Sequence, residues 1–160
     1  MKAITIHQPW ATLIALGEKR FETRGWPTKY RGRIAIHAAK KVDKEICQQE
    51  PFRSVLAKYG YTADSLPTGA IVATCELAEC WKWDDRDGVL LRIKPIIEYD
   101  AIGQVTNHLE ISNKEKAFGW YGAERFAWEL ADVQQFAEPV PAKGQQGLWN
   151  WGGERDASRT

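Results

Sequence analysis

The sequence predicts an α+β fold, a small and partly open mixed β-barrel with short helices at its rim. A chain of 160 residues has the usual length of one domain and can bury a core without metal or disulfide cross-links. Several segments alternate in hydrophobicity as strands do, and only two or three short helical patterns lie between them. Strands and helices do not alternate regularly, which argues against a doubly wound sheet and favours a small barrel.

The first part of the chain reads as a strand, a helix and two further strands. Residues 2–6 form the first strand, and Pro9 is suited to the first turn of a helix. Apolar residues then recur with the spacing of one helix face, and Gly17 is placed to end the helix in a left-handed conformation. Residues 20–25 and 33–38 are predicted to be strands.

The middle of the chain is patterned less evenly. Residues 43–59 predict a helix that Pro51 interrupts or restarts. Residues 70–80 are the clearest strand of the sequence. Residues 84–100 begin as a polar loop and continue as either a strand or a loosely packed segment, and the sequence assigns no role to this region.

The last part predicts a helix and two strands. The run at 112–115 has the capping-box pattern that opens a short helix. Residues 125–137 read as a long strand, and 144–147 read as a hairpin turn that leads into a final strand. Residues 152–160 are polar and are expected to be a disordered tail, so the domain is expected to span 1–151.

The cysteines indicate a reducing compartment. Cys47, Cys75 and Cys80 are an odd number without C-x-x-C spacing, which is typical of free thiols. If 70–80 is a regular strand, Cys75 and Cys80 lie on opposite faces. No signal peptide or membrane-spanning apolar run is evident, so we expect a cytoplasmic protein that does not enter a membrane. The histidines lack metal-ligand spacing, and we expect no metal and no other cofactor.

Positive charge is concentrated in one stretch. The whole chain has a formal net charge of +1, but residues 17–41 carry eight lysines and arginines against two acids. A local basic patch on a nearly neutral protein favours an anionic ligand held at one place over extended wrapping of a duplex. A solvated strand edge protected by charges explains the same pattern equally well.

The run Gly17-Glu-Lys-Arg-Phe-Glu-Thr-Arg24 gathers charges of both signs. Glu22 and Arg24 are two positions apart on a predicted strand, so they share a face and are roughly 6–7 Å apart. Lys19 lies at the turn that precedes this strand. Lys19 and Arg24 can hold a phosphate while Glu22 orients them or accepts from a base amino group. The alternative is a structural ion pair inside the barrel.

Aromatic residues next to basic ones occur in two loops. Aromatic faces beside guanidinium groups stack single-stranded bases and hold their phosphates. We therefore expect ligand contact from Trp26, Lys29, Tyr30, Arg31, Trp120 and Tyr121. Trp10, Trp128 and Trp149 lie in apolar patterns and are expected to fill the barrel ends. His37 is expected to be a hydrogen-bonded structural residue, with an acid–base or phosphate-binding role as the alternative.

Six motifs together resemble the ASCH domain of the PUA-like superfamily, in the form found in longer bacterial and phage members. They are I-x-x-P-W at 6–10, G-x-K-x-x-E-x-R at 17–24, W-P-T-x-Y-R-G at 26–32, I-H-A at 36–38, R-F-A-W-E-L at 125–130 and G-L-W-x-W at 147–151. The resemblance implies a β-barrel with a cleft beside the second motif and a role in binding RNA or other nucleic acid. Some relatives resemble ribonucleases, and one bacterial branch resembles an amidohydrolase acting on acetylated cytidine.

The amidohydrolase chemistry of that branch does not transfer directly to this sequence. The branch has a threonine nucleophile, beside the motif lysine, where this chain has Glu22. Thr23 is no substitute, because a step of one residue along a strand turns the side chain to the opposite face. Glu110 and Glu115 are candidates for the helper carboxylate. Hydrolysis with Glu22 as general base on water, assisted by Lys19, stays open.

The sequence thus predicts first a module that binds RNA, single-stranded nucleic acid or a nucleotide-like molecule. A small hydrolase that uses Lys19 and Glu22 is the second hypothesis, and a protein-interaction module is the third. The sequence does not determine the oligomeric state. The candidate ligand-binding residues are Lys19, Glu22, Arg24, Trp26, Lys29, Tyr30, Arg31, His37, Trp120 and Tyr121.

Overall fold

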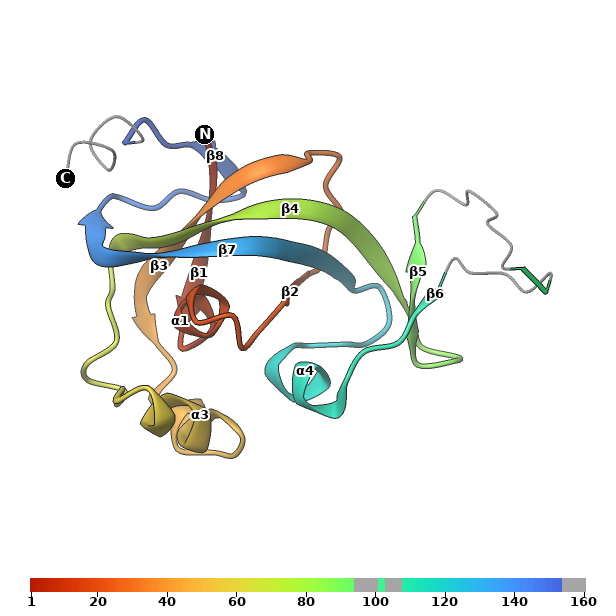
Figure 1. Cartoon of the computed structure of the whole chain (residues 1–160), viewed down its shortest axis with the longest axis horizontal. Helices are drawn as coiled ribbons and strands as arrows, with labels where there is room; N and C mark the ends of the chain where they lie inside the picture. Colours follow the sequence, from red (N-terminus) through yellow and green to blue (C-terminus); the bar gives the residue numbers. More distant parts are fainter. Residues whose placement is uncertain (94–100, 103–107, 154–160) are drawn as a thin grey trace.

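A computed structural model describes residues 1–93, 101–102 and 108–153 of the chain. Within these residues one mixed β-sheet forms the body of the molecule, and short helices lie against it and below it (Figure 1). The strands are β1 (Lys2–Gln8), β2 (Phe21–Arg24), β3 (Gly32–Val42), β4 (Ala70–Asp84), β5 (Val89–Arg92), β6 (His108–Leu109), β7 (Phe126–Pro141) and β8 (Leu148–Asn150). The helices are α1 (Trp10–Ala15), α2 (Lys44–Cys47), α3 (Phe52–Lys58) and α4 (Asn113–Phe118).

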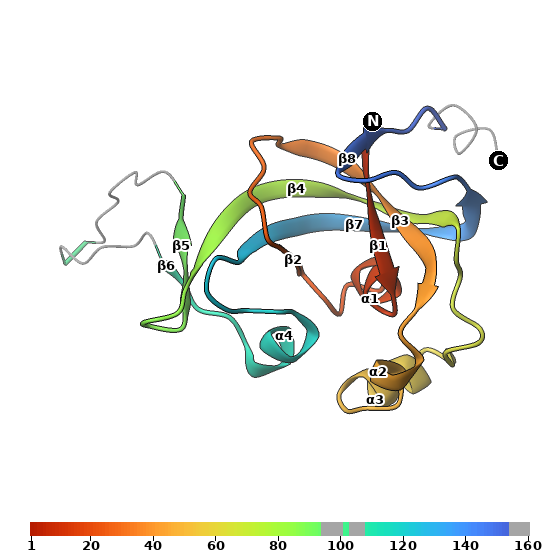
Figure 2. The ribbon, with the colours of Figure 1, turned by 180° about the vertical axis from the view of Figure 1, so that it is seen from behind.

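The sheet is open and strongly curved. Its main path runs β2-β7-β4-β3-β1-β8, and β5 and β6 extend it beyond β4. Strands β1 and β3 are parallel, and the other described pairs are antiparallel. The long strands β4 and β7 bend together, so that β2 lies across from β1 (Figure 2). Among the described residues β2 and β8 do not pair with each other. The α+β class with one mixed sheet is confirmed, whereas the predicted partly open barrel is not.

The opening in the sheet lies along one edge of β1. Strand β8 pairs with β1 through Lys2, Ala3 and Ile4. From Thr5 onward, the described residues give this edge of β1 no strand partner. The edge therefore faces the side chains of β2 across a gap, and this gap positions the candidate site.

Helix α1 lies against the sheet and holds the turn that carries Lys19. Its residues Ala11, Ile14 and Ala15 pack with isoleucines of β1 and β3 in the main core. Gly17 ends the helix with a φ of +76°, the left-handed conformation that its position predicted. Behind it, the amides of Glu18 and Lys19 both bond to a carbonyl of α1, which fixes the start of the path into β2.

Most predicted elements are confirmed, and several extend further than predicted. The strand predicted at 70–80 continues to Asp84, and β5 follows within the ambiguous region. The predicted hairpin at 144–147 is wrong, because β8 pairs with β1 and not with β7. The pairing of β8 with β1 joins residues far apart in the sequence, so the local turn residues do not reveal it. Residues 94–100 of the ambiguous region and 154–160 of the predicted tail lie outside the described residues.

The placement of Cys75 and Cys80 on opposite faces is also wrong. Both thiols are buried in the same core cluster. The register of β4 against β7 shifts between Leu77 and Glu79, and a β-bulge of this kind adds a residue and reverses the alternation. Burial raises the pKa of Cys75 to about 12.

No helix in the described part of the chain is long and apolar enough to cross a bilayer.

Candidate functional site

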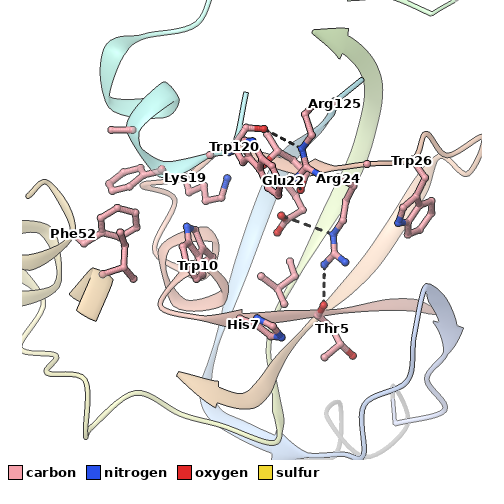
Figure 3. Close-up of a pocket in the computed structure, with 17 residues that line it drawn as sticks. Thr5, His7, Trp10, Lys19, Glu22, Arg24, Trp26, Phe52, Trp120 and Arg125 are labelled. Atoms are coloured by element: carbon pink, nitrogen blue, oxygen red, sulfur yellow. Dashed lines mark hydrogen bonds and ion pairs between the residues drawn. The ribbon is translucent and has the colours of Figure 1, made fainter. Parts of the chain in front are cut away.

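A cavity of about 570 Å³ opens where β2 faces the free edge of β1. This volume is within the range of small-molecule binding sites. Charged side chains from the turn before β2, from β2 itself and from the start of β7 converge on the cavity, and aromatic rings enclose it (Figure 3). Its lining includes Thr5, His7, Trp10, Lys19, Glu22, Arg24, Trp26, Phe52, Phe118, Trp120 and Arg125.

Lys19 is buried at one wall of the cavity, with only 1% of its surface exposed. Its Nζ donates to the carbonyl of Phe21, a bond within the turn that leads into β2. Burial lowers the pKa of Lys19, and the nearby carboxylates of Glu22 and Glu115 oppose this effect. The site thus contains a lysine that gives up its proton more easily than a solvated one.

Glu22 and Arg24 both line the cavity, as expected of side chains two positions apart on β2. Glu22 Oε1 lies 3.9 Å from Arg24 Nε. Glu22 is 8% exposed, and its Oε2 is buried without a hydrogen-bond partner among the described residues. A buried carboxylate oxygen without a donor is costly, so a ligand that supplies an N–H or O–H there gains affinity.

Arg24 also connects the two sides of the opening. Its Nη2 donates to the carbonyl of Thr5 over 2.9 Å, which joins β2 to the unpaired edge of β1 (Figure 3). The guanidinium has five N–H donors, and one bond to Thr5 leaves others for a ligand. Arg24 therefore both holds the opening at its present width and presents positive charge to the cavity.

Glu115 lies behind the site and anchors it. Ser112 caps α4 by accepting from the amide of Glu115, as the capping-box pattern predicted. The Glu115 carboxylate accepts from the amides of Arg20 and Phe21 at 3.0–3.2 Å and is 6% exposed. These bonds fix α4 to the start of β2. Glu110, the other candidate carboxylate, is exposed and does not line the cavity.

Two tryptophans offer ring faces near the mouth of the cavity. Trp120 is 69% exposed, and its ring lies 4.2 Å from the Arg125 guanidinium. Arg125 is itself held by its bonds to the carbonyls of Trp120 and Thr23. Trp26 is 37% exposed and packs edge-on against Trp128. A large exposed ring supported by a fixed guanidinium is a suitable platform for stacking a base.

The structure does not bring Lys29, Tyr30 and Arg31 to this cavity. Lys29 and Arg31 line a separate hollow, where Arg31 Nη2 lies 2.6 Å from Glu79 Oε1. Tyr30 packs on the main core and its hydroxyl donates to the carbonyl of Arg33. The loop leaves β2 and crosses toward β4, so its later residues move away from Arg24 although they follow it closely in sequence.

His37 and Tyr121 also lie elsewhere. His37 is 2% exposed in β3, and its Nε2 lies 2.7 Å from the carbonyl oxygen of Ala142. Tyr121 contacts Trp83 with tilted rings and packs against a separate core cluster, and burial raises the pKa of its phenol. Neither residue lines the cavity that holds Lys19.

Sequence reasoning missed several lining residues. Trp10 was expected to fill a barrel end, yet it lines the cavity and packs edge-on against Phe52. Arg125 closely follows the second aromatic loop and its glycines. A basic residue in this place could have been predicted to contact a ligand. Phe52 and Phe118 come from helices distant in sequence, and their apolar patterns do not distinguish a cavity wall from core.

Comparison with known proteins identifies the family and agrees with the fold. The ASCH domain family matches residues 4–140, which is most of the chain. The chain belongs to the ASCH family. The resemblance drawn from the sequence motifs is therefore confirmed, and the cavity lies against the G-x-K-x-x-E-x-R motif of this ASCH domain.

Two curated relatives and two solved structures are similar to this ASCH domain. Over 80 residues it is 35% identical to human and 34% identical to mouse "Activating signal cointegrator 1", covering 48% of this chain but 14% of each relative. Crystal structures of the ASCH protein from Zymomonas mobilis, a mutant and the unmutated protein, superpose with a TM-score of 0.52 at 16% identity. These alignments cover 99% of this chain and 95% and 92% of the others. At this identity they show the shared fold.

Proposed function

We propose that this ASCH domain binds single-stranded RNA and takes one nucleotide into the cavity beside Lys19, Glu22 and Arg24. The observation that carries the proposal is the Oε2 of Glu22, which is buried without a hydrogen-bond partner among the described residues, in a cavity of about 570 Å³ that is otherwise rich in cations. An acceptor of this kind fits the amino or imino edge of a base. The arginines around it fit the negative charge of the phosphate.

The arrangement supports distinct roles for the lining residues. Trp120 is exposed and rigidly backed by Arg125, so it supplies the stacking face. Arg24 and Arg125 reach the open side of the cavity and hold the phosphate. Lys19 lies deeper and bonds to the chain itself, so it sets the local charge beside Glu22. Lys29, Tyr30 and Arg31 have no part in this contact.

Binding of labelled single-stranded oligoribonucleotides to point variants tests this function. Trp120→Ala removes an exposed ring without emptying the core, and we expect it to weaken binding by about 1–3 kcal/mol, the range for one stacked base. Arg24→Ala should cost about 10- to 150-fold in affinity, the value of a charge-assisted hydrogen bond. Thermal unfolding of each variant checks that the fold survives.

Arg20→Ala is the matched control, because it removes the same charge from an exposed side chain that does not line the cavity. We expect it to weaken binding only slightly, through long-range charge. Equal losses in Arg20→Ala and Arg24→Ala would mean that the protein attracts RNA diffusely and that the cavity has no special role. Indifference of the wild type to every nucleic acid and to salt would favour a protein-interaction module instead.

The lowered pKa of Lys19 favours one second function, hydrolysis of RNA or of a modified nucleoside. A buried lysine beside a carboxylate is a typical acid–base arrangement, with Glu22 as base on water. Incubation with RNA and with acylated nucleosides, followed by product analysis, distinguishes the two functions. Turnover that Glu22→Gln abolishes while binding persists would establish the hydrolase. Binding without turnover would leave a recognition module.

A further inference from the structure

A second cavity, of about 860 Å³, lies beside the first and shares Thr5 with it. In the parallel pairing of β1 with β3, Thr5 lies opposite His37, and both residues line this second cavity. The segment between β7 and β8 forms its outer wall. The lining residues are Thr5, His37, Ala39, Lys40, Gly69, Pro141, Ala142, Lys143, Gly144, Gln145 and Gln146.

His37 gives this cavity an unused polar atom. Its Nε2 lies 2.7 Å from the Ala142 carbonyl, an oxygen that can only accept, so Nε2 carries the proton of that bond. In the neutral ring, Nδ1 is then an acceptor. It is buried and has no hydrogen-bond partner among the described residues. His37 is 98% buried and Gly144 covers its Nδ1, so the histidine forms a polar part of the cavity wall.

Gly144 lets the outer wall lie close to this histidine. A Cβ at position 144 would lie 2.7 Å from His37 Cε1 and 2.8 Å from Thr5 Oγ1, closer than atoms can approach. The glycine therefore brings the backbone of the segment directly over Thr5 and His37. Because the backbone is held at this position, the exposed side chains of Lys143, Gln145 and Gln146 extend from a fixed place in the cavity wall.

The charge of the second cavity matches that of the first. Lys40 and Lys143 are exposed at its rim, and its described lining residues include no carboxylate. The amides of Gln145 and Gln146 provide both donors and acceptors, which the edges of bases require. The two cavities thus offer cations and base-reading groups on either side of Thr5.

We propose that the second cavity binds the nucleotide adjacent to the one in the first, so that the ligand is a single strand of at least two nucleotides that crosses β1 at Thr5. This inference rests on the proposed function of the first cavity. Lys40 and Lys143 hold the backbone phosphates of the second nucleotide. The base lies against the segment between β7 and β8, where the exposed amides of Gln145 and Gln146 bond to its edge or to the ribose 2′-hydroxyl.

The test compares a ribonucleoside monophosphate with mixed-sequence oligoribonucleotides of two to six nucleotides by competition against a labelled hexamer. For the wild type we expect affinity to rise at least tenfold from one nucleotide to two or three. The double variant Lys40→Ala with Lys143→Ala should lose most of that rise and keep its affinity for the monophosphate. Lys82→Ala, which removes a charge from an exposed lysine of β4 outside both cavities, should retain the rise.

The outcomes separate this inference from the function on which it rests. A monophosphate that competes as well as the longer strands would overturn the second cavity and leave the first intact. A rise that the double variant retains in full would also overturn it. If Trp120→Ala and Arg24→Ala change neither the monophosphate nor the oligonucleotide affinity, the proposed function itself fails, and the inference fails with it.

Discussion

Replacement of Glu115 by alanine should destabilise the protein by about 2–4 kcal/mol, although this residue touches no proposed ligand. The carboxylate is buried and accepts from the amides of Arg20 and Phe21. A hydrogen bond to a charged group contributes about 1.5–3 kcal/mol, so two such donors give about 3–6 kcal/mol. The cost of burying the carboxylate in the wild type offsets part of this, which leaves the smaller figure.

The assay is equilibrium unfolding in urea, with Glu110→Ala as the matched control. Glu110 is an exposed glutamate five positions away, and we expect its replacement to change the free energy of unfolding by less than about 0.5 kcal/mol. For a chain of this length, each kcal/mol lost by Glu115→Ala should lower Tm by about 2–4 °C. Equal stability of the two variants would refute the reasoning, because it would mean that the two backbone amides find other partners at no cost.

Two further predictions concern groups outside the cavity. Bonds from Lys114 and Tyr59 lower the pKa of Glu18 to about 2, so its stabilising effect is present above pH 4.5 and is lost as the pH falls toward 2. Glu18→Gln should therefore lower the urea midpoint at pH 7, and the difference from the wild type should shrink as the pH falls from 4.5 to 2. A difference independent of pH would contradict this. Burial raises the pKa of Cys75 to about 12, so we expect folded protein at pH 8 to resist iodoacetamide at this thiol and unfolded protein to react, as peptide mass spectrometry can show. Modification of Cys75 at equal rates in both states would disprove its burial.

Local sequence patterns predicted the helices and strands of this ASCH domain better than they predicted which strands pair. The end of α1 at Gly17 and the cap of α4 at Ser112 depend on residues close in sequence, and both were predictable. The pairing of β8 with β1 depends on contacts between opposite ends of the chain, and the local glycines at 144–147 suggested a hairpin instead. The sequence of β4 alone likewise gives no signal for its bulges, because a bulge is defined by the register against β7.

The candidate site was predictable where it follows one strand and was not where it depends on the path of a loop. Glu22 and Arg24 share a face of β2 because the strand has a period of two. Arg31, seven residues beyond Arg24, was expected at the same place but is paired with Glu79 instead. The loop after β2 has no such period. Its charged and aromatic residues indicated which ligands it could bind, but they did not indicate where its side chains would lie. Arg125 arrives from the other end of the chain, and only the folded sheet brings it near Glu22.

The bond from Arg24 to Thr5 is a side-chain link between β2 and β1, which share no strand pairing among the described residues. In a closed barrel a continuous ladder of backbone bonds sets the distance between neighbouring strands, whereas here one guanidinium joins the edges of β1 and β2. The N–H that Arg24 gives to Thr5 cannot at the same time donate fully to a phosphate. A ligand that accepts this N–H would break the bond between Arg24 and Thr5, and the bond would form again when the ligand leaves. Such an exchange would alter one side-chain bond and leave every strand pairing of the described residues intact.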